Sequence, residues 1–209
     1  MISSPPSPFP ASNSHGREAG TQYHRVHNQK FNSRSFNPGL GRQSRFAPIF
    51  IGETPIPTQY LATGYECAVH ETIFHDVPFD EPTKTVGVDN IKPLAHSIVE
   101  LKRDLNLVPL FAPDLAKWNL SRADLIDTTA SHYHVTAEWA LAVHQNRTDA
   151  DGLIWTSKRC DPQLALMLFG DRVSEDDFIA IKTVDIYTNV SEMRDIHTFA
   201  ERVDITLVL

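Results

Sequence analysis

The strongest constraint on the fold is an irregular mixture of two hydrophobic periods along one chain. Residues 164–169 form a short apolar run that is typical of a strand, and residues 203–209 alternate as a closing strand does. Residues 134–145 instead place apolar side chains at helical spacing. Because these segments do not alternate strictly as strand, helix and strand, we predict a single α+β, or mixed α/β, domain. The strand order stays open.

One helix has a recognisable start. Thr63-Gly64-Tyr65-Glu66 fits a capping box, in which the side chains of Thr63 and Glu66 each accept a hydrogen bond from the other's backbone amide. Pro78 marks the exit from this helix. We expect strands at residues 23–27, 58–62, 97–102, 105–111, 153–156, 164–169 and 203–209, and further helices at 113–119, 134–145 and 191–200.

The first residues differ from the rest in composition. Residues 1–20 are rich in Ser, Pro, Asn and Gly and hold too little apolar surface to offset the entropy of ordering. We therefore predict a disordered tail over residues 1–20 and one folded domain over residues 21–209, which is an ordinary length for a domain.

The charge pattern argues against one class of function, general nucleic-acid binding. The chain has 19 Lys and Arg against 26 Asp and Glu, a formal charge of −7, whereas a general nucleic-acid binder needs an excess of basic residues. Residues 1–46 carry +5 and the remainder −12. A basic arm on an acidic body suits either a solvated segment or the steering of an anionic ligand.

Cysteine usage and hydropathy indicate where the protein works. Cys67 and Cys160 are the two cysteines, fewer than a disulfide-stabilised secreted domain has, and we predict that both are small buried hydrophobic residues. No apolar segment of a signal peptide follows Met1, and no run approaches the length of a membrane span. The expected location is the cytoplasm, without membrane contact.

Common ligand motifs are absent. The segment from His70 to His75 reads HExxxH, so on a helix the two histidines lie about 140° apart and cannot share one zinc ion. There is no Walker loop and no Gly-x-Gly-x-x-Gly, which argues against phosphate-loop and Rossmann sites. We expect no metal.

Several segments of the sequence resemble those of a known family. They are YHRVH at 23–27, RFAPIF at 45–50, TQYLATGYECAVHETIFH at 58–75, DGLIWTSKR at 151–159 and ALMLFGDRV at 165–173. In this order they resemble the RES domain, which is named for an arginine, a glutamate and a serine. The likeness is loose over residues 23–209 and sharp over 45–75 and 151–172.

The resemblance implies a fold, an activity and a partner. RES proteins are toxins of bacterial toxin–antitoxin pairs with a fold similar to ADP-ribosyltransferases. They consume NAD as their substrate by hydrolysis or phosphorolysis of the nicotinamide–ribose bond. Their antitoxin has an Xre-like helix-turn-helix domain, and the complex can contain a toxin homodimer. The apolar insert Ile49–Pro57 or the N-terminal arm would help to dock the antitoxin.

The resemblance also assigns the site residues. Glu71 is the carboxylate that stabilises the ribose cation, and Arg45 is its catalytic partner. Arg45 and Arg25 bind the pyrophosphate, because a planar guanidinium pairs with two phosphate oxygens. Tyr60 stacks on the cationic nicotinamide ring, and Ser157 hydrogen-bonds the ribose or the carboxamide.

Three functional hypotheses stay open. The chain cleaves NAD with water or phosphate as acceptor, it transfers ADP-ribose to a protein, or it is a non-catalytic binding module on the same fold. An Xre-like reading frame next to its gene would favour the toxin.

Overall fold

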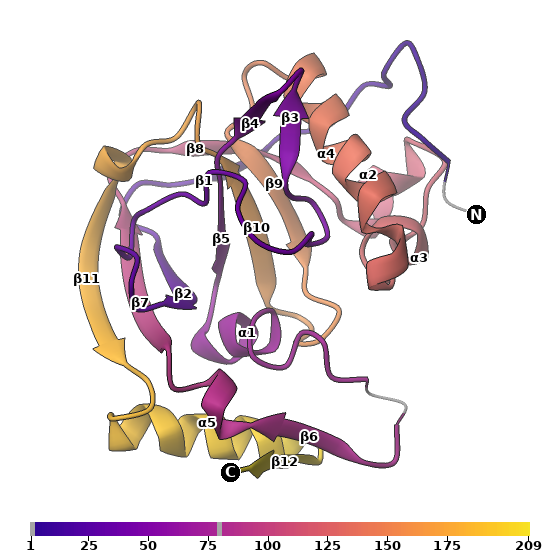
Figure 1. Ribbon diagram of the computed structural model, residues 1–209. Coiled ribbons are helices and arrows are strands. Elements are labelled where there is room, and N and C mark those ends of the chain that lie inside the picture. Colours follow the sequence, from indigo (N-terminus) through magenta and orange to yellow (C-terminus); the bar gives the residue numbers. More distant parts are fainter. Residues whose placement is uncertain (1–2, 79–80) are drawn as a thin grey trace.

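The computed structural model describes residues 3–78 and 81–209 (Figure 1). The strands are β1 (His15–Arg17), β2 (Gln22–Asn28), β3 (Ile49–Ile51), β4 (Thr54–Ile56), β5 (Thr58–Ala62), β6 (Lys84–Gly87), β7 (Leu94–Leu101), β8 (Leu105–Pro109), β9 (Gly152–Thr156), β10 (Leu164–Phe169), β11 (Phe178–Asp185) and β12 (Ile205–Val208). The helices are α1 (Tyr65–His70), α2 (Ala112–Ala116), α3 (Arg122–Leu125), α4 (Tyr133–Asn146) and α5 (Val190–Arg202).

An eight-stranded sheet organises the fold. Its strand order is β1-β8-β9-β10-β5-β2-β7-β11, and every neighbouring pair is antiparallel except β8 and β9. Figure 1 shows the sheet strongly curved, with β11 at one side and α2, α3 and α4 at the other. A parallel β12–β6 pair and a β3–β4 hairpin form two small extra sheets. This arrangement confirms the mixed α/β prediction.

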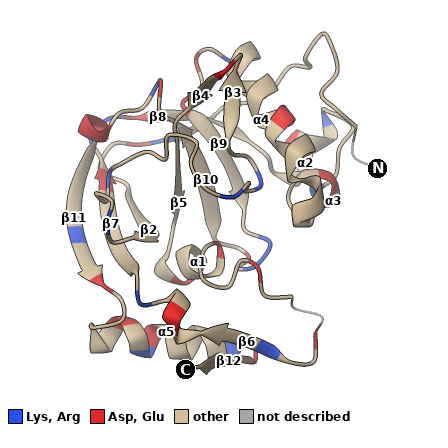
Figure 2. Cartoon of the chain, in the orientation of Figure 1, with Lys and Arg blue, Asp and Glu red and all other residues tan. Residues whose placement is uncertain are grey.

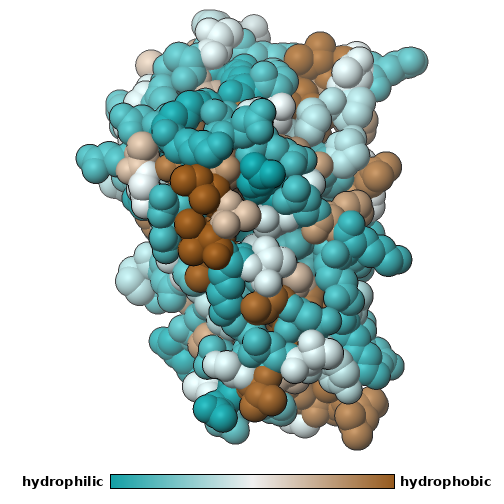
Figure 3. Space-filling model, turned by 90° about the vertical axis from the view of Figure 1, so that its left-hand side faces the viewer, coloured by the Kyte–Doolittle hydropathy of each residue, from teal (hydrophilic) through white to brown (hydrophobic). Residues whose placement is uncertain are grey.

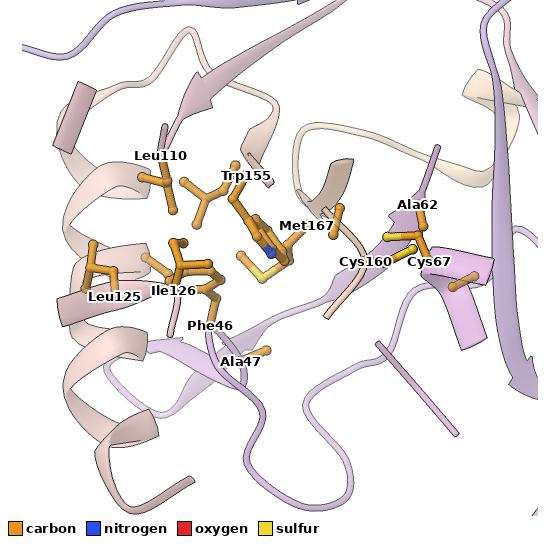
Figure 4. Packing of buried hydrophobic residues seen from close by; sticks show 14 of the residues in the cluster. Phe46, Ala47, Ala62, Cys67, Leu110, Leu125, Ile126, Trp155, Cys160 and Met167 are labelled. Carbon is orange, nitrogen blue, oxygen red and sulfur yellow. The ribbon is translucent and has the colours of Figure 1, made fainter. Parts of the chain in front are cut away.

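Two hydrophobic clusters cover the two faces of the sheet. Met167 of β10 belongs to the larger cluster, whereas its neighbours Leu166 and Leu168 belong to the smaller one, so β10 is buried on both faces. Figure 4 shows Trp155 and Phe46 packed in the larger cluster, with Cys67 and Cys160 side by side in another part of it. Both cysteines are free and buried, as predicted.

Strong local patterns gave accurate elements. β5 and β10 have the predicted bounds, and α4 extends the predicted 134–145 by one residue at each end. The helices α4 and α5 are the longest described, with 14 and 13 residues. In the described part of the chain, no helix is both long enough and apolar enough to cross a bilayer.

The edge strand β11 has no counterpart among the predicted elements. Phe178 is fully buried, but Ile179 and Ile181 are 43% and 48% exposed, so apolar side chains lie on both faces and the polar alternation of a strand is lost. Figure 3 faces this side of the molecule and shows hydrophobic surface along it. The two predicted strands at 97–102 and 105–111 exist, but β7 pairs with β2 and β11 rather than with β8.

The predicted capping box is wrong. The N-cap residue of α1 is Gly64 and it makes no side-chain cap. The Thr63 hydroxyl instead accepts from the amide of Leu164 and donates to its carbonyl oxygen, while Glu66 pairs with Arg202 of α5. The Thr63 hydroxyl therefore bonds to the start of β10 and, contrary to the prediction from the local pattern, does not cap the helix.

The predicted disorder of residues 1–20 is also wrong where the structure describes them. Residues 3–17, the N-terminal strap, lie along the α2–α4 layer and end in β1, which pairs with β8. Phe9 contacts both Trp118 and Trp139 edge-on, with centroids 5.3 and 6.0 Å away. Arg147 donates to backbone carbonyls of the strap. One aromatic anchor and donors from the body thus order a segment whose composition suggests disorder. Residues 1–2 lie outside the described part.

Candidate active site

Arg45, Glu71 and Ser157 come together from three distant segments. Arg45 lies in the loop before β3, Glu71 directly follows α1, and Ser157 directly follows β9. Nη1 of Arg45 is 3.6 Å from Oε2 of Glu71, and the Ser157 hydroxyl donates to Oε1 at 2.6 Å. The fold therefore brings the predicted catalytic pair into contact.

The Ser157 hydroxyl is held in one orientation. Its oxygen accepts hydrogen bonds from the amides of Arg159 and Cys160, both at 3.1 Å, which directs its own proton to Glu71. Ser157 is fully buried. The sequence suggested that this hydroxyl contacts the ribose or the carboxamide, whereas here it lies behind Glu71 and fixes the carboxylate.

Arg45 is a buried cation with unused donors. It is 2% exposed, and within residues 3–78 and 81–209 neither Nε nor Nη2 has a hydrogen-bond partner. Its carbonyl oxygen accepts from the Thr136 hydroxyl, which fixes the backbone, and its guanidinium lies 5.9 Å from the ring centre of Tyr133. Since buried charges are normally paired, this guanidinium has capacity for an anion in addition to Glu71.

Tyr60 anchors the loop that carries Arg45. Its hydroxyl accepts from the amide of Phe46 at 3.1 Å and forms a 3.0 Å hydrogen bond with the hydroxyl of Ser44. Its ring meets Trp155 edge-on, with centroids 6.2 Å apart. Burial raises the pKa of Tyr60 to about 12, so the phenol stays neutral at physiological pH.

These side chains border a cavity of about 380 Å³, which we call the catalytic cavity. Arg45, Tyr60 and Glu71 line it together with Tyr133. A carboxylate and a guanidinium thus face a hollow between two aromatic residues. This combination can hold a ligand that is cationic at one end and anionic at the other.

A second cavity of about 230 Å³ adjoins the first, and we call it the Arg25 cavity. Arg42, Ser44 and Tyr60 line both cavities, so the two are direct neighbours. Arg25 of β2 lies on its wall and donates to the carbonyl oxygen of Ser33 at 2.7 Å. Burial lowers the pKa of Arg25 to about 10, which leaves the side chain charged at neutral pH.

Sequence reasoning missed several site residues. Tyr133 begins α4 and Arg42 lies in the basic first part of the chain, and no local pattern marks either as a residue that lines the catalytic cavity. Lys158 and Arg159 line a third cavity of about 360 Å³ that shares Tyr133 with the catalytic cavity. Figure 2 shows basic positions on the loop leading into β3 and on the loop after β9. Their clustering depends on tertiary structure.

The two histidines of the HExxxH segment lie in different environments. His70 is 1% exposed in the core, whereas His75 forms hydrogen bonds with the Tyr133 hydroxyl and with Asp76. Over the residues that the structure describes, no three His, Cys, Asp or Glu side chains gather in a way that suits a metal ion.

Comparison with known proteins gives the family and a fold relative. The family model of the RES domain matches residues 22–188, a range that contains all five predicted site residues. A chain in the crystal structure of the M. tuberculosis MbcT–MbcA toxin–antitoxin complex is similar in fold, with a TM-score of 0.57 and 13% sequence identity. The similarity covers 81% of this chain and 86% of that one. No curated protein matches in sequence.

Proposed function

Since this chain belongs to the RES domain family, we propose that it is a cytoplasmic toxin that cleaves NAD between nicotinamide and ribose. One observation carries the proposal. A buried arginine with unused donors lies beside a carboxylate that a buried serine orients, and both border the same cavity.

Glu71 suits the chemistry of this bond. As the bond to nicotinamide breaks, positive charge develops on the ribose, and a fixed carboxylate stabilises that charge in a site of low dielectric. The bonding electrons leave with nicotinamide, which departs as a neutral molecule and needs no proton. Ser157 and Arg45 hold the carboxylate in place before the substrate arrives.

The arginines suit the anionic part of the substrate. Arg45 offers unused N–H groups in the catalytic cavity, and Arg25 lies in the adjoining one. A pyrophosphate between them would receive the charge-assisted hydrogen bonds that guanidinium groups form well. Tyr60 and Tyr133 supply aromatic walls for the cationic nicotinamide ring.

Nicotinamide release tests the proposal. We expect the purified chain to release nicotinamide from NAD, and Glu71→Gln to lower kcat by about 10²–10³-fold, the cost of losing one electrostatic stabiliser of a transition state. Glu138→Gln, at an exposed position of α4, is the matched control and should retain full activity. Equal rates for wild type and Glu71→Gln would disprove the role of this carboxylate.

The acceptor follows from the same assay. A rate that depends on inorganic phosphate, with ADP-ribose phosphorylated at the ribose carbon that carried nicotinamide, indicates phosphorolysis. Free ADP-ribose as the product indicates hydrolysis. Absence of turnover until a protein substrate is added would instead favour ADP-ribosylation of that protein.

We further propose an Xre-like antitoxin as the partner. The structural relative comes from a toxin–antitoxin complex, and this chain exposes Phe50 and Ile51 on the β3–β4 hairpin, at 42% and 51%. The product of a neighbouring Xre-like reading frame should co-purify with the chain and suppress nicotinamide release. Light scattering of that complex would show whether it contains a homodimer of the toxin. Failure of the two proteins to co-purify would refute this pairing.

A further inference from the structure

Another hollow lies next to the Arg25 cavity and shares no lining residue with the part of the site that holds Glu71. It has a volume of about 400 Å³, and Phe31, Phe36 and Leu40 line it, so we call it the Phe31 pocket. Arg25 and Asn37 line both this pocket and the Arg25 cavity. The Phe31 pocket, the Arg25 cavity and the catalytic cavity therefore lie next to one another in that order.

The Phe31 pocket exposes apolar side chains that the fold does not use. Phe31 is 58% exposed and Leu40 is 68% exposed, although both border a hollow. Phe36 is half-buried and packs against Phe178 of the sheet, with ring centroids 6.5 Å apart. Large apolar side chains around a concave surface are typical of a ligand site rather than of ordinary protein surface.

The walls of the Phe31 pocket are fixed by hydrogen bonds. Arg25 donates to the carbonyl oxygen of Ser33, and Gln59 donates to that of Ser35 at 3.3 Å. The Asn37 side chain accepts from the amide of Leu40 at 2.8 Å and donates to its carbonyl oxygen at 2.9 Å. A pocket that is already shaped loses little entropy when it binds a ligand.

The chemical order of the series matches that of a dinucleotide. An apolar, aromatic pocket comes first, an arginine cavity follows, and a carboxylate cavity ends the series. NAD carries, in the same order, a flat adenine ring, a pyrophosphate, and a ribose that bears nicotinamide. A purine ring stacks on aromatic side chains through its apolar faces.

We propose that the Phe31 pocket binds the adenine ring of NAD, with Arg25 between adenine and pyrophosphate. This inference rests on the proposed function and adds to it. Phe31 and Leu40 are binding residues for the half of the substrate that does not react, and they make the enzyme selective for the dinucleotide over nicotinamide mononucleotide, which contains the same scissile bond.

The test compares these two substrates. We expect Phe31→Ala to raise KM for NAD by about tenfold, the scale of one lost base–aromatic stack, with kcat nearly unchanged. The kcat/KM for nicotinamide mononucleotide should stay at the wild-type value, since that molecule lacks adenine. Because Phe31 is exposed, the variant should fold. Tyr187→Ala, at an aromatic residue in the turn after β11 that is 43% exposed, is the matched control.

A binding measurement separates the pocket from catalysis. ADP contains the adenine and the pyrophosphate without nicotinamide, and calorimetry should show its Kd about tenfold weaker for Phe31→Ala. Unchanged ADP binding, or equal losses with both substrates, would overturn the adenine site while leaving the cleavage proposal intact. ADP binding that depends on Phe31, in a protein that cleaves neither substrate, would overturn the cleavage proposal and support the pocket.

Discussion

At the scale of single residues, the Ser157 hydroxyl sets the position of the Glu71 carboxylate. Two backbone amides fix its oxygen, and its proton goes to Oε1 of Glu71 at 2.6 Å. Ser157 is fully buried and is not among the residues that line the catalytic cavity, so we propose that it acts through the glutamate. The roles of the two residues are therefore coupled.

We predict that Ser157→Ala lowers kcat by about 10–100-fold, because a hydrogen bond to a charged group contributes about 1.5–3 kcal/mol. KM for NAD should change little, since the hydroxyl lies behind the carboxylate. Steady-state kinetics of nicotinamide release measure both constants. Ser191→Ala, at an exposed position of α5, is the control.

A double-variant comparison checks the coupling. In a protein that already carries Glu71→Gln, Ser157→Ala should lower kcat by a far smaller factor than it does in the wild-type protein, because the two groups work as a unit. Fully additive losses would contradict the assignment of Ser157 as the positioning residue of Glu71.

The site was predictable residue by residue only through family resemblance. The sequence places Arg45, Glu71 and Ser157 far apart, and nothing local shows that they meet. Tyr133 could not be predicted as a site residue, because an aromatic residue near the start of a helix most often belongs to the core. Its place in the catalytic cavity follows from the packing of α4 against the loop of Arg45.

At the scale of elements, β9 and β10 depend on a close approach at one glycine. A Cβ atom at Gly152 would lie 2.1 Å from the carbonyl oxygen of Met167 in β10. Only a residue without a side chain allows the two strands to pair here. Since Ser157 follows β9, this pairing also positions the site.

We predict that Gly152→Ala lowers the free energy of unfolding by about 3 kcal/mol or more, because the added methyl group meets backbone that cannot rotate away. Urea unfolding measures the change. Gly16→Ala in β1 is a matched strand control, since a Cβ atom there meets nothing within 4 Å, and it should be nearly neutral. Similar losses at both glycines would contradict the steric explanation.

Elements with strong internal patterns were the predictable ones. β10 is apolar throughout because both of its faces are buried, and its run reads directly as a strand. β6 consists of Lys84–Gly87 and is a strand only because β12 pairs with it in parallel. The Thr63 hydroxyl likewise bonds to β10, which no local rule anticipates.

At the scale of the whole molecule, a buried polar chain joins α5 to the sheet. His24 of β2 hydrogen-bonds His96 of β7 at 2.9 Å, and His96 bonds Glu192 of α5 at 2.7 Å. Lys182 of β11 pairs with the other oxygen of Glu192, and the Tyr65 ring stacks on His96. Burial lowers the pKa of His96 to about 4, against the opposing attraction of Glu192.

We predict a loss of stability in mild acid. In the unfolded chain, His96 becomes protonated below about pH 6.5. In the folded protein, its lowered pKa keeps it neutral down to about pH 4. The contribution of neutral His96 to the free energy of unfolding is fully present above pH 6.5. It falls by about 3 kcal/mol as the pH decreases toward 4. Burial also lowers the pKa of His24, which adds in the same direction.

Thermal unfolding across this pH range measures the effect. His96→Gln should flatten the dependence of Tm on pH, whereas His197→Gln, at an exposed position of α5, should leave it unchanged. A Tm of the wild-type chain that is constant from pH 7 to 4 would contradict the prediction.

The overall arrangement was the least accessible from sequence. Mixed segment types predicted a mixed α/β domain, but strand order depends on long-range pairing. The N-terminal strap shows the same limit, because Phe9 is ordered by Trp118 and Trp139, which lie far along the chain.

The same long-range pairing controls when activity can arise during protein synthesis. Arg45 and Glu71 leave the ribosome early, but β5 between them pairs with β10, and the hydroxyl that orients Glu71 belongs to Ser157. A nascent chain that ends before residue 157 lacks both β10 and Ser157. On the proposed function, in which the chain destroys NAD of its own cell, translation itself would delay the damage until most of the polypeptide has been made, and incomplete products would stay harmless.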